Sequence, residues 1–256
     1  MKRVRVIPIL LIKNGGLVKS VKFKNYKYVG DPLNAVKIFN EKEVDEIVLL
    51  DISATAEKRP PDTFKISQIA SELFMPLAYG GGITSLTEIT NLISAGVEKV
   101  VLNSIAFSNP LLVCEAAKCI GSQSVVVSID VKKNWLGKYR VFIQNGAKNT
   151  GIDPVTYACE MASAGAGEIF LNSIDRDGSF EGYDTTLIEE VSKAVNIPVV
   201  AIGGAGSIED FATAISKGAS AVAAGSIFVF QRPHKAVLIS YPAQNELKER
   251  LFNKIN

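Results

Sequence analysis

The sequence predicts an α/β protein: a single (β/α)8 TIM barrel over residues 1–256, built from two fused half-barrels at about 1–120 and 121–256. Three observations predict it. Eight apolar strand-like runs alternate with helical stretches, 256 residues suit one such barrel, and the two halves of the chain resemble each other. A doubly wound open sheet is the alternative that the same alternation allows.

The strand-like runs are apolar and rich in β-branched residues along their whole length, as is typical of parallel strands buried on both faces. Between them lie stretches such as TSLTEITNLISAG and SIEDFATAISKG, which open on a Ser or Thr cap and close on Gly. The eight runs are VRVIPILLI, EIVLLDI, MPLAYGG, EKVVLNS, QSVVVSID, GEIFLNSI, IPVVAIGG and SAVAAGSIFV.

An internal repeat favours the barrel over the open sheet. The segment MPLAYGGGITSLTEITNLISAGVEKVVLNSIAF, from Met75, aligns without a gap with IPVVAIGGAGSIEDFATAISKGASAVAAGSIFV, from Ile197. Pro76 then matches Pro198, and Gly96 matches Gly218. Spacing that holds through two strands and a helix indicates a duplicated half-barrel.

Composition argues against several classes of function. The chain has 28 basic and 26 acidic residues, a net charge of +2, so nucleic-acid binding is not expected. A single histidine and three cysteines, none in a C-x-x-C pair, argue against a metal site, and we expect no metal and no cofactor. Without an apolar run of about 18 residues or a signal peptide, we expect a cytoplasmic protein with no membrane partner.

Two glycine-rich strand ends predict phosphate binding. In each half, one strand ends in glycines and the next ends in small polar residues, at the barrel face where backbone N–H groups can approach an anion. Two copies at equivalent places favour a bisphosphate ligand, although plain turns remain an alternative. The predicted phosphate-binding residues are Gly81, Gly82, Asn103, Ser104, Gly178, Gly203, Gly204, Gly225 and Ser226.

Motifs along nearly the whole chain resemble one family. They are GDPLNAVKIFNEKEVDEIVLLDI, YGGGI, GSQSVVVSID, KNTGI, GAGEIFLNSIDRDGSFEGYD and GGAGSIEDF. The chain thereby resembles the cyclase subunit of imidazole glycerol phosphate synthase, and its SIDRDG and GGAG pieces are less similar to the sister isomerase. The resemblance implies condensation of ammonia with a ribulosyl aminoimidazole bisphosphate. The products are imidazole glycerol phosphate, for histidine biosynthesis, and an aminoimidazole carboxamide ribonucleotide.

The resemblance also implies a pair of catalytic aspartates, one ending the first strand and one ending the fifth. Asp130 is the second of them, whereas Leu11 stands where the family motif has the first. Lys19 is retained and, by resemblance, helps to order the substrate and the loop after the first strand. Because leucine cannot transfer a proton, we expect impaired cyclase activity unless Asp51 or Asp177 takes over.

Four charged residues near strand starts form a second predicted site. Arg5, Glu46, Lys99 and Glu168 lie on the first, second, fourth and sixth strands. From spacing alone they predict a salt-bridge ring or plain surface charges. The resemblance implies a gate for ammonia that comes from a glutaminase docked on the N-terminal face.

Two hypotheses for function follow. The chain resembles paralogs with Leu-Leu in the first strand and a tail like FVFQRPHKAVLISYP, which accompany a glutaminase and a sugar amidotransferase in making surface polysaccharides with acetamidino sugars. The first hypothesis is therefore a barrel that conducts ammonia to a partner, with residues 237–242 as a docking strand or as core. The second is a working cyclase.

We also expect Trp135, Tyr139 and Phe142 to pack a hairpin over the mouth.

Overall fold

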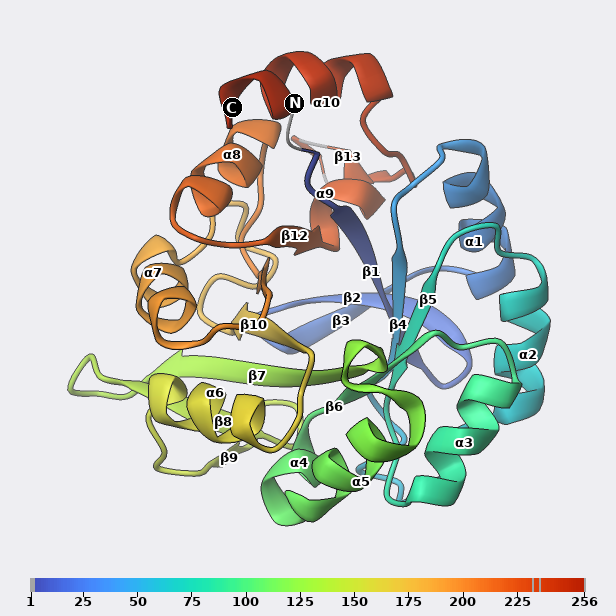
Figure 1. The fold of residues 1–256 in the computed structure, drawn as a ribbon. Helices are drawn as coiled ribbons and strands as arrows, with labels where there is room; N and C mark the ends of the chain where they lie inside the picture. Colours follow the sequence, from blue (N-terminus) through green and yellow to red (C-terminus); the bar gives the residue numbers. More distant parts are fainter. Residues whose placement is uncertain (1–2, 232, 235, 256) are drawn as a thin grey trace.

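The structure is a computed structural model that describes residues 3–231, 233–234 and 236–255. Eight parallel strands form a closed barrel, because β7 pairs with both β6 and β10 (Figure 1). The TIM-barrel prediction is confirmed, and an open sheet is excluded by this closure. The barrel strands are β1 (Val6–Lys13), β4 (Ile47–Asp51), β5 (Leu77–Gly80), β6 (Lys99–Leu102), β7 (Val125–Lys133), β10 (Glu168–Ser173), β11 (Val199–Ile202) and β12 (Ala221–Ala224).

Helices surround the barrel (Figure 1). Ser85 and Ser207 start α3 and α8 with capping boxes, in which the serine side chain accepts from the third helical N–H while the acidic side chain there accepts from the serine N–H. No helix among the described residues is long and apolar enough to cross a bilayer. The helices are α1 (Pro32–Glu41), α2 (Thr63–Ser71), α3 (Leu86–Ser94), α4 (Ser104–Ser108), α5 (Leu111–Ile120), α6 (Pro154–Ser163), α7 (Thr185–Ala194), α8 (Ile208–Ser216), α9 (Ser226–Val229) and α10 (Gln244–Arg250), with 3-10 turns η1 (Ser122–Ser124) and η2 (Phe252–Lys254).

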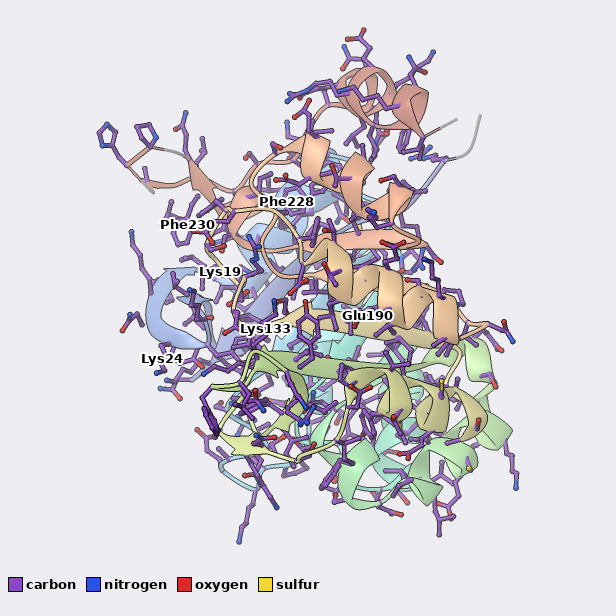
Figure 2. The ribbon with its side chains drawn as sticks, turned by 90° about the vertical axis from the view of Figure 1, so that its left-hand side faces the viewer. Lys19, Lys24, Lys133, Glu190, Phe228 and Phe230 are labelled. Atoms are coloured by element: carbon purple, nitrogen blue, oxygen red, sulfur yellow. The ribbon has the colours of Figure 1, made fainter. Side chains whose placement is uncertain are left out.

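Three hairpins extend the barrel on one side. β2 (Gly16–Val21) and β3 (Lys24–Gly30) follow β1, β8 (Tyr139–Ile143) and β9 (Lys148–Asn149) follow β7, and β13 (Phe230–Gln231) pairs with β14 (Ala236–Val237). Figure 2 shows the first and last of these projecting on the side where Lys24 and Phe230 are labelled. This is the carboxyl-end face of the barrel, called the mouth below.

The structure corrects the expectation for Trp135 and refines the expectation for residues 237–242. Trp135 is 91% exposed, so the prediction that it packs the hairpin is wrong for this residue, which lies at the turn between β7 and β8. The tail after β14 divides in two: Val237 and Leu238 are exposed, while the buried Tyr241 donates from its hydroxyl to the carbonyl of Val6 at 2.9 Å.

The strands bury apolar side chains on both faces, which explains the double leucine in β1. Leu10 belongs to the layer between strands and helices, whereas Leu11 packs against the cluster inside the barrel. Successive residues of a strand point to opposite faces. Leu11 is therefore the apolar inward-facing residue nearest the mouth on β1.

Candidate functional site at the barrel mouth

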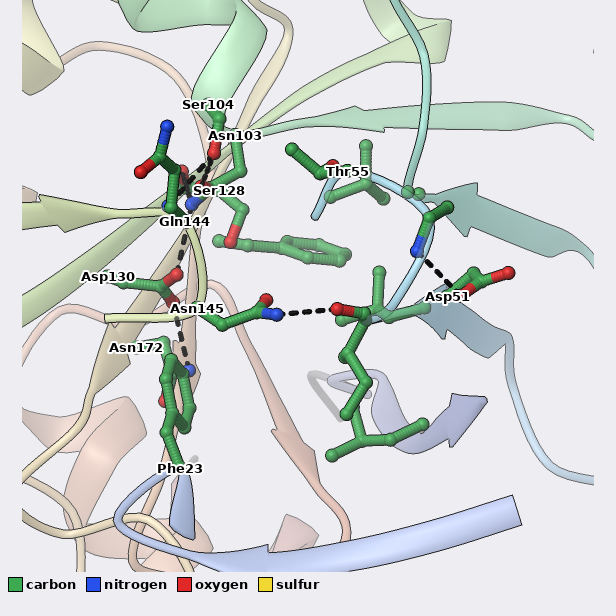
Figure 3. A pocket seen from close by; sticks show the side chains of 18 of the residues that line it. Phe23, Asp51, Thr55, Asn103, Ser104, Ser128, Asp130, Gln144, Asn145 and Asn172 are labelled. Carbon is green, nitrogen blue, oxygen red and sulfur yellow. Dashed lines mark hydrogen bonds between the residues drawn. The ribbon is translucent and has the colours of Figure 1, made fainter. Parts of the chain in front are cut away.

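A cavity of about 570 Å³ opens at the carboxyl ends of the strands. Every barrel strand contributes to its lining, as expected for the face where barrel enzymes place their active sites. Figure 3 shows Asp130 on one wall and Asp51 on the other. All the predicted catalytic and phosphate-binding residues line this one cavity: Leu11, Lys19, Asp130, Gly81, Gly82, Asn103, Ser104, Gly178, Gly203, Gly204, Gly225 and Ser226.

Asp130, near the end of β7, lies between two asparagine amides. Asn103 donates to its Oδ2 at 3.0 Å and Asn172 donates to its Oδ1 at 3.1 Å (Figure 3). Burial raises the pKa of Asp130 to about 7, aided by the charge of Asp177 and opposed by the two amide hydrogen bonds. A carboxyl group with a pKa near neutrality can both take and release a proton at neutral pH.

Leu11 occupies the opposite side of the mouth. In the barrel order β1-β4-β5-β6-β7-β10-β11-β12, β1 and β7 are four strands apart in a ring of eight, and so lie across from each other. Leu11, Leu50 and Ile202 pack against the apolar cluster that fills the barrel. The wall that faces Asp130 is therefore hydrocarbon at the position where the resemblance implies a carboxylate.

Asp51 is held in a fixed network at the end of β4. Its Oδ1 accepts from the N–H and hydroxyl of Ser53 and from the N–H of Ala54, at 2.9–3.1 Å, and its Oδ2 accepts from Arg59 at 3.0 Å. With both oxygens engaged by donors, Asp51 is poorly placed to exchange a proton with a ligand.

Asp177 lies in the loop after β10, on the mouth side. Its Oδ2 accepts from the hydroxyl of Ser20 at 3.2 Å, and its backbone carbonyl accepts from the N–H of Lys22. Burial raises the pKa of Asp177, while Lys19, Ser20 and the backbone of Phe23 oppose the shift. These contacts tie Asp177 to the hairpin after β1 and to Lys19.

Lys19 projects from β2 into the cavity and is 5% exposed. Its Nζ donates to the carbonyl of Ile9 at 2.5 Å. Burial lowers the pKa of Lys19 to about 8, and the charge of Asp177 opposes this effect.

The two predicted phosphate cradles lie at the ends of β5–β6 and β11–β12. Their glycines permit a backbone that other residues could not adopt: a Cβ on Gly81 would lie 2.2 Å from the carbonyl oxygen of Asp51, and one on its repeat equivalent Gly203 would lie 2.7 Å from that of Ser173. Both have positive φ, 117° and 87°. Equivalent glycines thus make equivalent close approaches in the two halves of the barrel.

Sequence reasoning missed Asn172, the second amide on Asp130. Asn172 lies near the end of β10 within IFLNS, and Asn103 directly follows β6 within VVLNS. The shared Leu-Asn-Ser triplet was the signal that could have found it. Its buried Oδ1 has no hydrogen-bond partner among the described residues, so this acceptor is open to a donor group in the cavity.

The turn after β8 was also missed. The N–H of Gln144 donates to the Ser104 hydroxyl at 3.0 Å, and the Asn145 side chain donates to the carbonyl of Ile52 across the mouth (Figure 3). Gln144 and Asn145 both have positive φ, near 55°. The Asn145-Gly146 pair between β8 and β9 was the signal for the turn itself. Its contacts with Ser104 and Ile52 could not be inferred, because they join parts of the chain that are far apart in sequence.

At the other end of the barrel, the four predicted strand-start charges form a closed ring. Arg5 pairs with Glu46 and Glu168, and Lys99 pairs with the same two carboxylates at 2.9 and 3.0 Å. Burial alone would lower the pKa of Arg5, but its contacts with Glu168 and Glu46 raise it. One carboxylate oxygen, Glu46 Oε1, is buried without a partner among the described residues.

The fold and these two sites define a barrel enzyme scaffold with a ligand cavity at its mouth and a charged ring at its base. The model of the histidine biosynthesis protein family matches residues 5–233. The chain belongs to this family and, within it, to the HisF-type cyclase subunits of imidazole glycerol phosphate synthase.

Similar proteins cover the chain almost end to end. A HisF subunit of Leptospira interrogans is 50% identical over 254 residues, covering 98% of this chain and 100% of that one. A hisF2 subunit of Pseudomonas aeruginosa is 52% identical over 248 residues, with 96% of this chain and 99% of that one covered. The assignment of these two proteins as synthase subunits is provisional. The HisF subunit of Endomicrobium trichonymphae is 44% identical over 231 residues, with 90% and 89% covered.

Proposed function

We propose that this barrel docks a glutaminase on its N-terminal face and conducts ammonia to its mouth for use by a partner, a sugar amidotransferase. Its own cyclase activity is impaired. The observation that carries the proposal is the hydrocarbon wall at Leu11, opposite Asp130, on an otherwise complete mouth.

The loss of one proton-transfer group is severe because the reaction needs protons both removed and delivered. General acid–base catalysis contributes about 10²–10⁴-fold per group. The other carboxyl groups that line the mouth offer poor substitutes: Asp51 is saturated with donors, and Glu88 is engaged by the N–H groups of Thr84 and Ser85 at the start of α3. Asp177 follows β10, which neighbours the strand of Asp130, so it does not take the place of a carboxylate on the facing strand β1.

The ring of Arg5, Glu46, Lys99 and Glu168 supports the conduit part of the proposal. It spans the base of the barrel, directly below the apolar interior. Paired charges cost less to keep buried than single ones, so the ring can remain stable and still part at one bridge to pass a small neutral molecule. In this proposal it is the ammonia gate.

The mouth side offers apolar surface for the partner that receives ammonia. Trp135, Leu136, Val237 and Leu238 are exposed on hairpins or directly after them, and aromatic and aliphatic side chains of this kind are buried in protein interfaces. The phosphate cradles are retained, and in this proposal they hold a bisphosphate or phosphate ligand at the mouth.

A turnover assay tests the proposal. The purified chain is given ammonium salt and the ribulosyl aminoimidazole bisphosphate, beside a HisF subunit that works in histidine biosynthesis. We expect turnover at least 100-fold below that of the comparison enzyme. Comparable turnover would instead establish the second hypothesis, a functional cyclase.

A second assay tests the glutaminase. Glutamine hydrolysis by a candidate glutaminase is measured with and without the barrel, and complex formation is followed by size-exclusion chromatography. We expect a stable complex and faster hydrolysis. A glutaminase that neither binds nor responds would overturn the docking part of the proposal.

A further inference from the structure

Lys19 is placed differently from the other lysines of the mouth. It is 5% exposed, and its Nζ donates to one backbone carbonyl, that of Ile9. Within the described part of the chain it forms no ion pair at 4.0 Å or less. By contrast, Lys24 and Lys133 lie exposed on the hairpins (Figure 2).

Lys19 stands between two cavities. A second, smaller cavity of about 140 Å³ lies beside the main one, under the hairpin after β1. Both cavities are lined by Lys19, Ser20, Gly178 and Ser226. Lys19 thus lines both cavities, next to the predicted phosphate cradle of the second half-barrel.

Gly225 makes room for the amine. A Cβ at this position would lie 1.8 Å from the Lys19 Nζ, so any larger residue would displace it. The same glycine belongs to the phosphate cradle formed with Gly203, Gly204 and Ser226. The chain therefore holds an amine nitrogen directly beside backbone suited to a phosphate.

The protonation state of this amine favours nucleophilic chemistry. Burial lowers the pKa of Lys19 to about 8. At pH 7.5 roughly a quarter of it is neutral, against about 0.1% of an ordinary lysine, whose pKa is about 10.4. Desolvated lysines of this kind form Schiff bases with carbonyl substrates.

We propose that Lys19 captures small phosphorylated aldehydes and ketoses as an imine, with their phosphate in the cradle of Gly203, Gly204, Gly225 and Ser226. This inference rests on the phosphate-binding part of the proposed function. It adds a covalent activity that neither the cyclase reaction nor ammonia conduction requires.

The chemistry balances without a further reactant. The neutral Nζ bonds to the carbonyl carbon, the nitrogen loses a proton and the carbonyl oxygen gains one, which gives a carbinolamine. The hydroxyl then gains a proton and leaves as water, the nitrogen lone pair forms the C=N bond, and the nitrogen gives up its remaining proton. Asp177, within electrostatic range of Lys19 and with a raised pKa, is placed to supply and recover that proton.

Reductive trapping tests the proposal. The full chain is incubated at pH 7.5 with glyceraldehyde 3-phosphate and cyanoborohydride, which reduces the imine to a stable secondary amine, and the modified peptides are identified by mass spectrometry. We expect labelling of Lys19 at least tenfold faster than of Lys24 or Lys133. Inorganic phosphate should slow the labelling of Lys19 and leave that of the exposed lysines unchanged.

Matched variants complete the test. Lys19→Met should remove the fast-labelling site, while Lys24→Met should leave it unchanged, and circular dichroism checks that both variants fold. In the unmodified protein, the rate at Lys19 should rise through about pH 8. Equal labelling of Lys19 and the exposed lysines, or none at Lys19, would overturn the proposal. Because trapping needs neither ammonia nor a glutaminase, failure of the conduit proposal leaves this result unaffected.

Discussion

The buried charged side chains at the base of the barrel pair with one another, whereas Asp130 at the mouth is held by neutral groups. At the base, Arg5 and Lys99 alternate with Glu46 and Glu168, so every charge has two partners of opposite sign. At the mouth, Asp130 has only neutral amide donors and faces the leucine side chain of Leu11 across the barrel.

The difference indicates that the paired charges at the base serve stability, whereas the carboxyl group of Asp130 at the mouth suits proton transfer. In the base ring, attraction between oppositely charged neighbours offsets much of the desolvation cost of burying them. At the mouth, the Asp130 carboxyl group has a pKa near 7, which suits it for proton transfer, and the hydrocarbon side chain of Leu11 faces it. In the proposed function, the base is a complete gate and the mouth lacks one proton-transfer group.

The largest expected effect comes from completing the mouth. Leu11→Asp places a carboxylate across from Asp130, and we expect cyclase turnover with ammonium salt to rise by a factor of about 10²–10⁴. Leu50→Asp is the matched control, because it adds a carboxylate to the same apolar wall on the neighbouring strand. A folded Leu11→Asp variant with no gain would show that the mouth has diverged beyond this one position.

The second largest expected effect comes from breaking the base ring, which should lower the free energy of unfolding. Glu168→Gln leaves Arg5 and Lys99 sharing a single carboxylate, and removal of one partner from a buried ion pair typically costs about 3–5 kcal/mol. Urea denaturation measures the free energy of unfolding. The exposed neighbour Glu98→Gln should stay within about 0.5 kcal/mol of the unmodified protein. A small loss for Glu168→Gln would mean that the ring is solvated and adds little.

The barrel itself could be predicted because its signal is continuous. Strands buried on both faces read as apolar runs, and a duplicated half repeats glycines at fixed spacing, so the strands and the glycine turns at their ends can be located from the sequence. The base ring was also within reach, since a charge at the start of a buried strand must find a partner near it. The face on which Leu11 lies follows from the period of two in β1.

Contacts made by loops could not be predicted in the same way. The saturation of Asp51 depends on the turn that brings Ser53, Ala54 and Arg59 to its two oxygens. The contact of Asn145 with Ile52 joins residues 93 positions apart. Such contacts depend on turn geometry and chain crossing, for which polar loop residues give no periodic signal.

The smallest of these effects concerns Asp130 itself and is visible through pH. Its pKa is about 7 in the folded chain and near 3.9 in an unfolded one, so between these values the folded state binds the extra proton. The free energy of unfolding should therefore fall as pH rises from 4 to 7 and then level off. Asp130→Asn cannot ionise and should gain about 2–4 kcal/mol relative to the unmodified protein between pH 4 and pH 8. The exposed Glu249→Gln serves as control: it retains Asp130, so its free energy of unfolding should follow that of the unmodified protein across this range. If the curves of the unmodified protein and of Asp130→Asn stay parallel across this range, Asp130 ionises as an ordinary surface carboxyl does. The two ends of the barrel would then not differ in how they hold buried charge.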